Sequence, residues 1–555
     1  MTAAEAGPPA MEPDETQQDV GSVSTSTAVG SADAERADRT AMLRARLLTP
    51  MPEDGIWSWL GPLLVTAFAA FLRFYRLSTP QAIIFDETYY AKDAWSILQH
   101  GVEWNTVQNA NNLILAGHTN IFQACSGTLC GEYVVQPPVG KLLIAAGEWL
   151  FGLNPLGWRV ASAFFGSLAI LVMCRIARRM TRSTLLGCLA GLLMSLDGLE
   201  LVLSRTGILD VFLMFFVLAA FGCLVIDRDV SRARLARAVA PDGQDDMGPP
   251  LGIRKWRVAA GLLIGLACAC KQDAAWYIFA FAGLSIAWDI GARRAAGLRA
   301  YVRGGLARDG KWLPVTLGVI PLVTYIATWS GWLVTTTGYD RNYAAQHGVR
   351  IPVISALYSL VEYHKEMLQF GVTLNKTHPY MSQPLGWIVL SRPVLFWAQC
   401  YTSQAGTQAC PRVYSGPEWW GEVTSLGNPA IWWVAIPAML CCLGWWLTRR
   451  DWRAGAALLC LAAGWLTWLP FTVRTKFDYY SLEFEPFLIL CIVLCLGLII
   501  GPATASLWRR ALGASVVGAY VLAVVALFWY FYPILAYQVI TYANWLSHMW
   551  YHGWI

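Results

Sequence analysis

The sequence predicts an all-α protein that crosses a membrane many times, with about eleven spanning helices and additional amphipathic helices on one surface. Of its 555 residues, 56% are hydrophobic and only 14% are charged, whereas soluble domains average about 25% charged residues. The 28 Trp, 22 Tyr and 22 Phe residues suit the aromatic belts at the two membrane surfaces. The basic residues lie in short loops beside apolar runs, so no nucleic acid is expected as a partner.

Eleven apolar runs approach the 17–25 residues that a helix needs to span a bilayer. They are residues 57–76, 157–177, 184–203, 207–226, 257–275, 276–291, 312–333, 430–447, 454–471, 485–501 and 511–532. Only Lys271, Gln272 and Asp273 separate the fifth run from the sixth, so the chain could turn there. Residues 1–50 lack an apolar face and are expected to be a disordered cytoplasmic tail, followed by one transmembrane domain over 51–555.

Arginine and lysine residues concentrate in alternate loops, which predicts the orientation in the membrane. These loops contain residues 178–182, 228–257, 293–311, 449–453 and 509–510. They are assigned to the cytoplasm together with the N-terminus, and an odd number of spans then places the C-terminus outside. Loops 79–156 and 334–429 and the short loop around Arg474 consequently face the exterior of a multi-pass cell-membrane protein.

Four of the 14 cysteines, Cys125, Cys130, Cys400 and Cys410, lie outside the predicted spans, and all four fall in exterior loops. Disulfide bonds persist in oxidising compartments. The local pairings Cys125–Cys130 and Cys400–Cys410 are therefore predicted, as one of three possible connectivities. A four-cysteine zinc site is the alternative, although the C-x4-C and C-x9-C spacings fit structural zinc poorly.

Helices that do not span are predicted in the exterior loops. The segment from Asp86 to Gln99 has the pattern of an interfacial helix, with Gly101 just after its end. Residues 139–151 follow Gln136-Pro137-Pro138 and form an apolar segment too short to span. Residues 383–398 are expected to be a third surface segment. Together these segments could roof a groove at the membrane surface.

Asp86 and Glu87 come directly after the first apolar run, where ionised carboxylates are costly without partners or water. One interpretation is structural, with Asp86 as the N-cap and Glu87 in the first turn of the following helix. The other is chemical, because a carboxylate held at a helix end can act as a general base. Adjacent helical residues point about 100° apart, so one would react and the other would orient.

Several cations are predicted at the same exterior surface, where a positive charge indicates either a ligand site or an ion pair. They are Lys141, Arg159, Arg205, Lys271, Arg474 and Lys476. Structural explanations exist for some of them: Lys141 could snorkel, Lys271 could pair with Asp273, and Arg205 with Asp210. Their common location instead favours an anionic ligand such as a lipid phosphate. Asp197 and Asp210 are expected mainly as partners that hold Arg205 or Arg159.

No metal or cofactor is expected. The sequence contains no HExxH, CxxC, P-loop or GxSxG motif, and its seven histidines are scattered. Asp227-Arg228-Asp229 matches the D-x-D pattern of nucleotide-sugar enzymes, but it lies in a charged cytoplasmic loop and carries little weight.

An ordered set of short motifs resembles the bacterial protein O-mannosyltransferases. The motifs are FDETYY (85–90), QPPVGK (136–141), LGWRVASAFFG (156–166), LDG (196–198), SRTGILD (204–210), CKQDAAWY (270–277) and RTKFDYYSLEFEPF (474–487). They occur in family order over nearly all of 57–500. The sequence departs from the family at Gln136, where the family motif has His, and at Gln272-Asp273, where an aromatic residue usually follows Lys271.

The resemblance implies the fold of the GT-C membrane glycosyltransferases, a polyprenyl-phosphate-mannose donor and Ser/Thr hydroxyls of secreted proteins as acceptors. It implies that Asp86 is the general base, that Glu87 orients a substrate, and that transfer is a single displacement with inversion. The residues expected to bind substrate are Gln136, Lys141, Arg159, Arg205, Asp210, Lys271, Arg474, Lys476 and Tyr479. Besides membrane lipids, the secretion translocon is a further partner that the resemblance suggests.

Two other functions fit the exterior acidic motif. One is a GT-C enzyme that glycosylates a lipid or a cell-wall glycan. The other is a non-enzymatic transporter of polyprenyl lipids, although such proteins usually contain internal repeats and broken helices, and no repeat is evident here.

Overall fold

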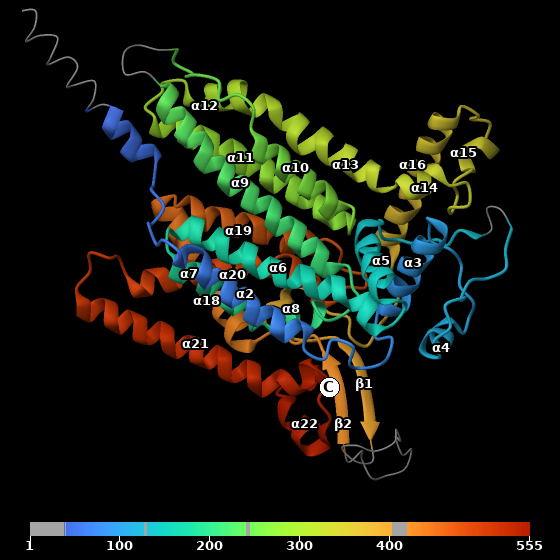
Figure 1. The fold of residues 1–555 in the computed structure, drawn as a ribbon. Coiled ribbons are helices and arrows are strands. Elements are labelled where there is room, and N and C mark those ends of the chain that lie inside the picture. The colour runs from blue at the N-terminus through green and yellow to red at the C-terminus, as the bar shows by residue number, and fades with distance from the viewer. Residues whose placement is uncertain (1–37, 39, 127–129, 240–244, 402–418) are drawn as a thin grey trace, which may run out of the picture.

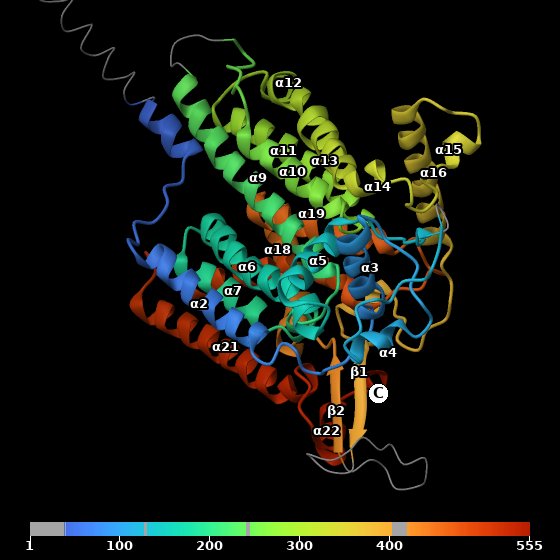
Figure 2. The same ribbon diagram turned by 45° about the vertical axis from the view of Figure 1, so that its right-hand side comes forward.

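Long helices run side by side through the protein and place its loops at two opposite ends (Figures 1 and 2). The computed structural model describes residues 38, 40–126, 130–239, 245–401 and 419–555. The longest helices are α2 (Trp57–Phe74), α6 (Pro155–Thr181), α9 (Asp210–Ala238), α11 (Ala275–Ala295), α18 (Pro429–Arg449) and α21 (Leu507–Leu535). Residues 301–328 form one further long helical stretch, which includes α12 (Tyr301–Gly304) and α13 (Ile320–Thr328) and continues into α14 (Ser330–Val334).

Seven of the described helices are long and apolar enough to cross a membrane, which confirms a polytopic membrane fold. Shorter helices occupy the other four predicted spans: α7 (Thr184–Ser195), α10 (Lys255–Cys268), α19 (Trp452–Trp465) and α20 (Glu485–Ile500). The span expected over 184–203 is interrupted, because α7 ends at Ser195 and α8 (Gly198–Leu203) starts after Asp197. The total of eleven spans stays a prediction.

Helix α9 lies at the centre of the bundle and packs against α6, α10 and α11. Its apolar window is 83% buried, compared with 22% for α2 and α21. The sequence explains this position, since Val211 to Val225 is apolar on every side of the helix and such helices are buried all round. Whatever lies at the first turn of α9 is therefore held rigidly.

Shorter elements gather at the end where α9 begins (Figures 1 and 2). Two of them, α3 (Glu87–His100) and α5 (Val139–Phe151), confirm the predicted surface helices; Gly101 and Gly152 follow them with φ of 78° and 83°. The sequence reading missed α4 (Ala110–Leu115), α15 (Tyr343–Gln346), α16 (Pro352–Thr373), α22 (Tyr542–His548) and an antiparallel sheet in the order β1 (Leu395–Tyr401), β2 (Trp419–Thr424), β3 (Ile540–Thr541).

The third predicted surface segment, residues 383–398, is wrong as a continuous helix. Only α17 (Pro384–Trp387) is helical there, and β1 begins at Leu395. Leu390, with a φ of 56°, already departs from helical geometry, and Pro393 disfavours helix at the residue before it, so no helix resumes before β1. Phe396 of β1 reaches the Asp86 turn, where its ring stacks on that of Phe85 with centroids 4.5 Å apart.

Two further expectations concern the N-terminal tail and the cysteines. Residues 40–47 are helical, and Leu47 packs with Leu235 and Leu251, so the expected disorder is wrong for this part of the tail. Residues 1–37 and 39 lie outside the described residues.

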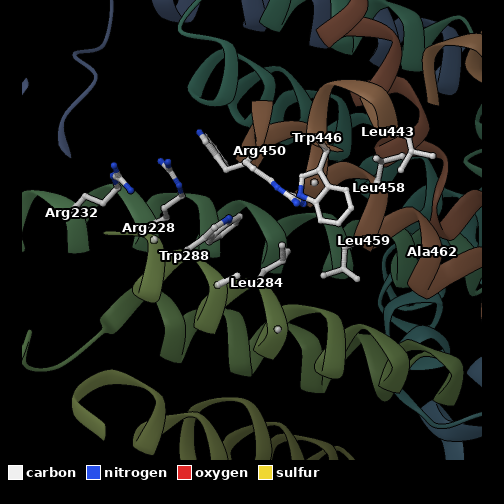
Figure 3. A pocket seen from close by; sticks show the side chains of 16 residues that line it. Arg228, Arg232, Leu284, Trp288, Leu443, Trp446, Arg450, Leu458, Leu459 and Ala462 are labelled. Carbon is white, nitrogen blue, oxygen red and sulfur yellow. The ribbon is translucent and has the colours of Figure 1, made fainter. Parts of the chain in front are cut away.

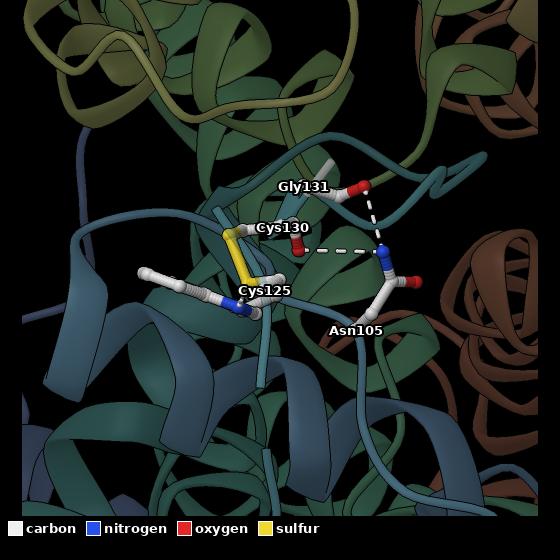
Figure 4. The surroundings of a disulfide bond; sticks show 5 residues. Asn105, Cys125, Cys130 and Gly131 are labelled. Atoms are coloured by element: carbon white, nitrogen blue, oxygen red, sulfur yellow. Dashed lines mark hydrogen bonds between the residues drawn. A yellow bond between two sulfur atoms is a disulfide. The ribbon is translucent and has the colours of Figure 1, made fainter. Parts of the chain in front are cut away.

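Cys125 and Cys130 form the predicted disulfide bond, and the Asn105 amide donates hydrogen bonds to the carbonyl oxygens of Cys130 and Gly131 beside it (Figure 4). Cys410 is not among the described residues, so its pairing with Cys400 stays a prediction.

Candidate active site

Asp86 lies in a tight turn between the end of α2 and the start of α3. The residue before it, Phe85, has a φ of 44°, a left-handed conformation that is strained for a bulky residue. Aromatic packing holds Phe85 in place, since its ring stacks on Phe396 and meets Tyr479 edge-on at 5.5 Å. The strain thus fixes the direction in which the next residue, Asp86, presents its carboxylate.

The N-cap role considered for Asp86 is wrong. Asp86 occupies the N-cap position of α3, but its side chain makes no hydrogen bond to the helix. It accepts a long hydrogen bond from the Tyr479 hydroxyl at 3.4 Å instead. The carboxylate is therefore not used to hold the helix end and remains available for chemistry.

Glu87 behaves in the opposite way. It is fully buried, and its two oxygens accept bonds from Nε of Arg159 at 2.7 Å and from Nη2 of Arg159 at 2.9 Å. The backbone N–H groups of Ile84 and Gly207 add two more bonds, each 3.0 Å long. A carboxylate with four donors has little capacity left for a substrate, so Glu87 joins the Asp86 turn to α6 and to the segment before α9.

Arg159 uses its remaining hydrogens on the same turn. Its Nη groups donate to the carbonyl oxygens of Leu77, Pro80 and Ala82, at 3.3, 2.9 and 2.8 Å. With the two bonds to Glu87, these contacts employ all five N–H groups of a guanidinium. The geometry therefore favours a positioning role for Arg159 over contact with a ligand.

Arg205 and Lys141 are also engaged inside the protein. Arg205 does not pair with Asp210; it donates to the carbonyl oxygens of Leu72, Arg73, Tyr75 and Arg76, and so binds the last turn of α2. Lys141 is buried in α5 and pairs with Glu103 and, at 3.9 Å, with Asp93. Gln136, just before α5, is partly exposed.

Asp197 holds neither Arg205 nor Arg159, contrary to expectation. It caps α8, accepting from the backbone N–H groups of Leu199 and Glu200, and it also accepts from Asn428 and Trp432 of the α18 region. Its position inside an apolar run is explained by these four donors, since a buried carboxylate needs such partners.

Asp210 and Lys271 form a buried ion pair of 2.9 Å close to Asp86. Asp210 begins α9 and Lys271 follows α10, so two rigid elements set their separation. The Lys271 ammonium lies 4.3 Å from the centre of the Tyr480 ring. The alternative pairing of Lys271 with Asp273 is therefore not the one formed.

The surroundings of Asp86 raise its pKa to about 7. Removal from water is the main cause, because it disfavours the charged form, and repulsion from Asp210 adds to it. Attraction to Lys271 and the hydrogen bond from Tyr479 act in the other direction. A carboxylate that titrates near neutral pH is well matched to accept a proton from a hydroxyl group.

Arg474 and Lys476 lie on the irregular segment that leads to Tyr479. The Arg474 guanidinium stacks over Trp468 at 4.9 Å and approaches the Tyr480 ring at 5.9 Å. Its Nε donates to the carbonyl oxygen of Gly371, whereas its Nη1 is buried and has no partner among the described residues. Lys476 is buried and donates to Gln383 and to the carbonyl oxygen of Phe471.

The structure therefore brings together Asp86, Asp210, Lys271 and Tyr479, with Arg474 joined to them through Tyr480. It places Glu87 and Arg159 behind the turn and holds Arg205 and Lys141 in structural contacts. Sequence reasoning missed Tyr480, whose ring is shared by two cations, and Tyr90, which lies close enough to Asp86 for their charges to interact. Tyr480 and Tyr90 both lie within the sequence motifs described above. Their place in these motifs is the one sequence feature that could have identified them as site residues.

Helices long and apolar enough to cross a membrane, with a carboxylate turn beneath surface helices at one end, define a polytopic membrane protein with a polar site at one end of its bundle. Residues 63–330 match the family model of the dolichyl-phosphate-mannose-protein mannosyltransferases, and residues 356–554 match that of the C-terminal four-transmembrane region of protein O-mannosyltransferases. The chain belongs to the protein O-mannosyltransferase family.

Bacterial relatives resemble the chain over most of its length. It is 37% identical to a polyprenol-phosphate-mannose–protein mannosyltransferase of Mycolicibacterium smegmatis over 523 residues, which cover 91% of this chain and 94% of the relative. The corresponding Corynebacterium glutamicum protein is 32% identical over 527 residues, covering 92% and 96%. The fold resembles a chain of the yeast Pmt1–Pmt2 complex bound to its sugar donor, with a TM-score of 0.64, 15% identity and coverage of 93% and 94%.

The different surroundings of the two adjacent carboxylates predict different effects on stability. Glu87→Gln leaves the buried Arg159 guanidinium without its counter-charge and should lower the free energy of unfolding by about 3 kcal/mol. Asp86→Asn should leave the apparent melting temperature unchanged or raise it, because burial already disfavours the charged form of Asp86. Thermal unfolding of the purified variants at pH 8 checks this, and equal losses in both would contradict the assignment.

Proposed function

We propose that this chain transfers mannose from polyprenyl-phosphate mannose to Ser/Thr hydroxyls of secreted proteins, at the end of the bundle where Asp86 lies. The observation that carries the proposal is Asp86 itself: it has no ion-pair partner within the described chain, its pKa is raised to about 7, and it lies near Lys271, which shares the Tyr480 ring with Arg474. The relatives' names supply the donor and the class of acceptor.

In the proposed reaction, the acceptor hydroxyl oxygen attacks C1 of mannose while Asp86 accepts the hydroxyl proton. The bond between C1 and the phosphate oxygen breaks on the opposite side of the sugar, so the anomeric centre inverts and polyprenyl phosphate leaves. A positioned base of this kind contributes roughly 10²–10⁴-fold to the rate.

Arg474 and Lys271 would stabilise the leaving phosphate. The unpartnered Nη1 of Arg474 supports this role, because a buried guanidinium N–H without a bond is costly until a ligand accepts it. Lys271 stays paired with Asp210 but keeps positive charge near the same ring of Tyr480. Because these cations supply the positive charge, we include no metal ion in the reaction.

We also propose that the Asp86 end faces the exterior and the arginine-rich end faces the cytoplasm, together with the N-terminus. The positive-inside bias of the loops supports this orientation. Acceptor proteins would then be reached as unfolded chains that leave the secretion translocon. The alternative acceptors are lipids or cell-wall glycans, and a competition experiment between peptide and glycan acceptors tests this alternative.

Asp86→Asn should lower kcat by about 10²–10⁴-fold, because the base is lost, while donor binding stays close to the wild-type value. Transfer of radiolabelled mannose from a polyprenyl-phosphate donor to a Ser/Thr-rich peptide measures kcat. Asp340→Asn is the matched control, since Asp340 lies in a different exterior segment outside the cluster. Wild-type transfer by Asp86→Asn would show that Asp86 is not the base.

The pH dependence of transfer should report the pKa of Asp86. Because the base acts only when deprotonated, kcat/KM should fall as the pH drops through about 7. Asp210→Asn removes a repulsion that raises this pKa, so the acid limb should move to lower pH by about one unit. A pH–rate profile of each protein checks the shift, and a limb that moves upward or stays in place would refute the coupling.

Arg474→Gln should reduce kcat/KM for the donor roughly ten- to a hundredfold, the equivalent of a charge-assisted hydrogen bond of about 1.5–3 kcal/mol. Arg474→Lys should restore little of this, because an ammonium cannot reproduce the planar guanidinium over Trp468. Arg350→Gln, an exposed arginine in the exterior loop, is the control. Equal kinetics for the Arg474 and Arg350 variants would remove Arg474 from the site.

A further inference from the structure

A cavity of about 620 Å³ lies far from Asp86, between the later part of α9, α11, α18 and the first part of α19 (Figure 3). The length of helix α9 gives the distance between the cavity and Asp86. Asp210 begins it beside Asp86, and Arg228, which lines the cavity, follows 18 residues later, about 27 Å at 1.5 Å per residue. The cavity therefore lies at the arginine-rich end of the bundle and takes no part in the proposed transfer.

One end of the cavity is strongly cationic. Arg228, Arg232 and Arg450 line it, and none of its 16 lining residues is an aspartate or glutamate. The carboxylates next to these arginines in the sequence are already bound: Asp229 by Arg179, Arg182 and Arg228, Asp227 by Arg254, and Asp451 by Arg453. The Nε of Arg228 is buried without a partner among the described residues. An anion is thus the ligand that this end lacks.

The other end of the cavity is apolar. Figure 3 shows the arginines toward one side and Leu443, Leu458, Leu459 and Ala462 toward the other. On α11, Gly283, Ala287 and Gly291 line the wall at four-residue spacing, and a Cβ atom added to either glycine would meet nothing within 4 Å. Small residues here leave an open channel between α11 and α19 that suits a hydrocarbon chain.

Tryptophans lie between the two parts. Trp446 lies beneath Arg450, with the guanidinium 5.5 Å from the ring centre, and Trp452 lies beneath Arg228 at 3.7 Å. Tryptophan prefers the boundary between lipid headgroups and acyl chains. Along the cavity, cationic residues are therefore followed by tryptophans and then by apolar residues. This order matches the polarity profile of one membrane leaflet.

We propose that this cavity binds one anionic phospholipid, with its phosphodiester between Arg228 and Arg450 and an acyl chain along the Gly283–Gly291 wall of α11. Basic pockets between membrane helices recognise anionic headgroups in this manner. Charge complementarity decides against a zwitterionic lipid, whose choline would meet three arginines. The site is independent of the mannosyl donor, since it lies at the opposite end of α9.

Native mass spectrometry of the purified full-length chain tests the proposal, with phosphatidylglycerol and phosphatidylcholine of identical acyl chains added in turn. The wild-type protein should retain one phosphatidylglycerol in preference to phosphatidylcholine. Arg450→Gln, at an exposed position where folding is not at risk, should weaken phosphatidylglycerol binding roughly fivefold, and the Arg228→Gln/Arg450→Gln double variant should abolish the preference. Gly283→Leu should reduce the binding of both lipids by filling the chain channel.

Matched controls lie next to each altered residue. Arg449→Gln removes a cation one position away that does not line the cavity, and Gly444→Leu adds the same side chain to an α18 glycine outside it; both should bind like the wild-type protein. Equal retention of the two phospholipids by the wild-type protein, or undiminished phosphatidylglycerol binding in the double variant and in Gly283→Leu, would overturn the proposal. Retention of added polyprenyl phosphate but not of phosphatidylglycerol would overturn it as well.

Discussion

The buried pair between Glu87 and Arg159 is the interaction on which the site depends. Arg159 donates all of its N–H groups to the stretch from Leu77 to Glu87, and the Glu87 carboxylate also accepts from the backbone N–H groups of Ile84, within that stretch, and of Gly207, before α9. One arginine of α6 thus fixes a stretch that has no regular structure of its own. The left-handed backbone of Phe85 and the unpaired carboxylate of Asp86 both cost free energy. They persist because the Glu87–Arg159 pair holds the turn in place.

Many buried charges elsewhere in the protein are paired, although the carboxylates of Glu148 and Glu485 are buried without a hydrogen-bond partner among the described residues. Arg73 with Glu200, Lys141 with Glu103, Lys271 with Asp210, and Arg254 with Asp227 are all inside the bundle and all paired. Unpaired charge is costly at such depths. Several guanidinium nitrogens are nevertheless buried without a partner among the described residues, and they include Nη1 of Arg474, beside Tyr480, and Nε of Arg228, in the distant cavity.

The positions of most helices could be predicted from the sequence, because long apolar runs and the glycines that follow helix ends are local features. They located α3 and α5 to within a residue, and they located the membrane part of α9 as a span over 207–226, although the helix continues to Ala238. These local signals could not reveal the sheet, since β1 and β2 are separated by residues 402–418 and β3 pairs with β2 from more than a hundred residues later.

For the candidate site, the sequence motifs identified Asp86, Lys271 and Arg474. Sequence could not distinguish cations that bind a ligand from cations that bind carbonyl oxygens, as Arg159 and Arg205 do, because that depends on folded partners.

The near-neutral titration of Asp86 has a consequence for the order of events. Burial and the nearby Asp210 raise the pKa of Asp86 to about 7, so its carboxylate takes up a proton more readily than that of an exposed aspartate. In the proposed reaction, the anionic phosphodiester of the donor would add negative charge near Asp86 and raise its pKa further, which disfavours the deprotonated form that acts as the base. Lys271 and Arg474 offset that charge from around a single aromatic ring, Tyr480. In the proposed reaction, neutralisation of the donor phosphate and deprotonation of Asp86 would therefore depend on the same two cations.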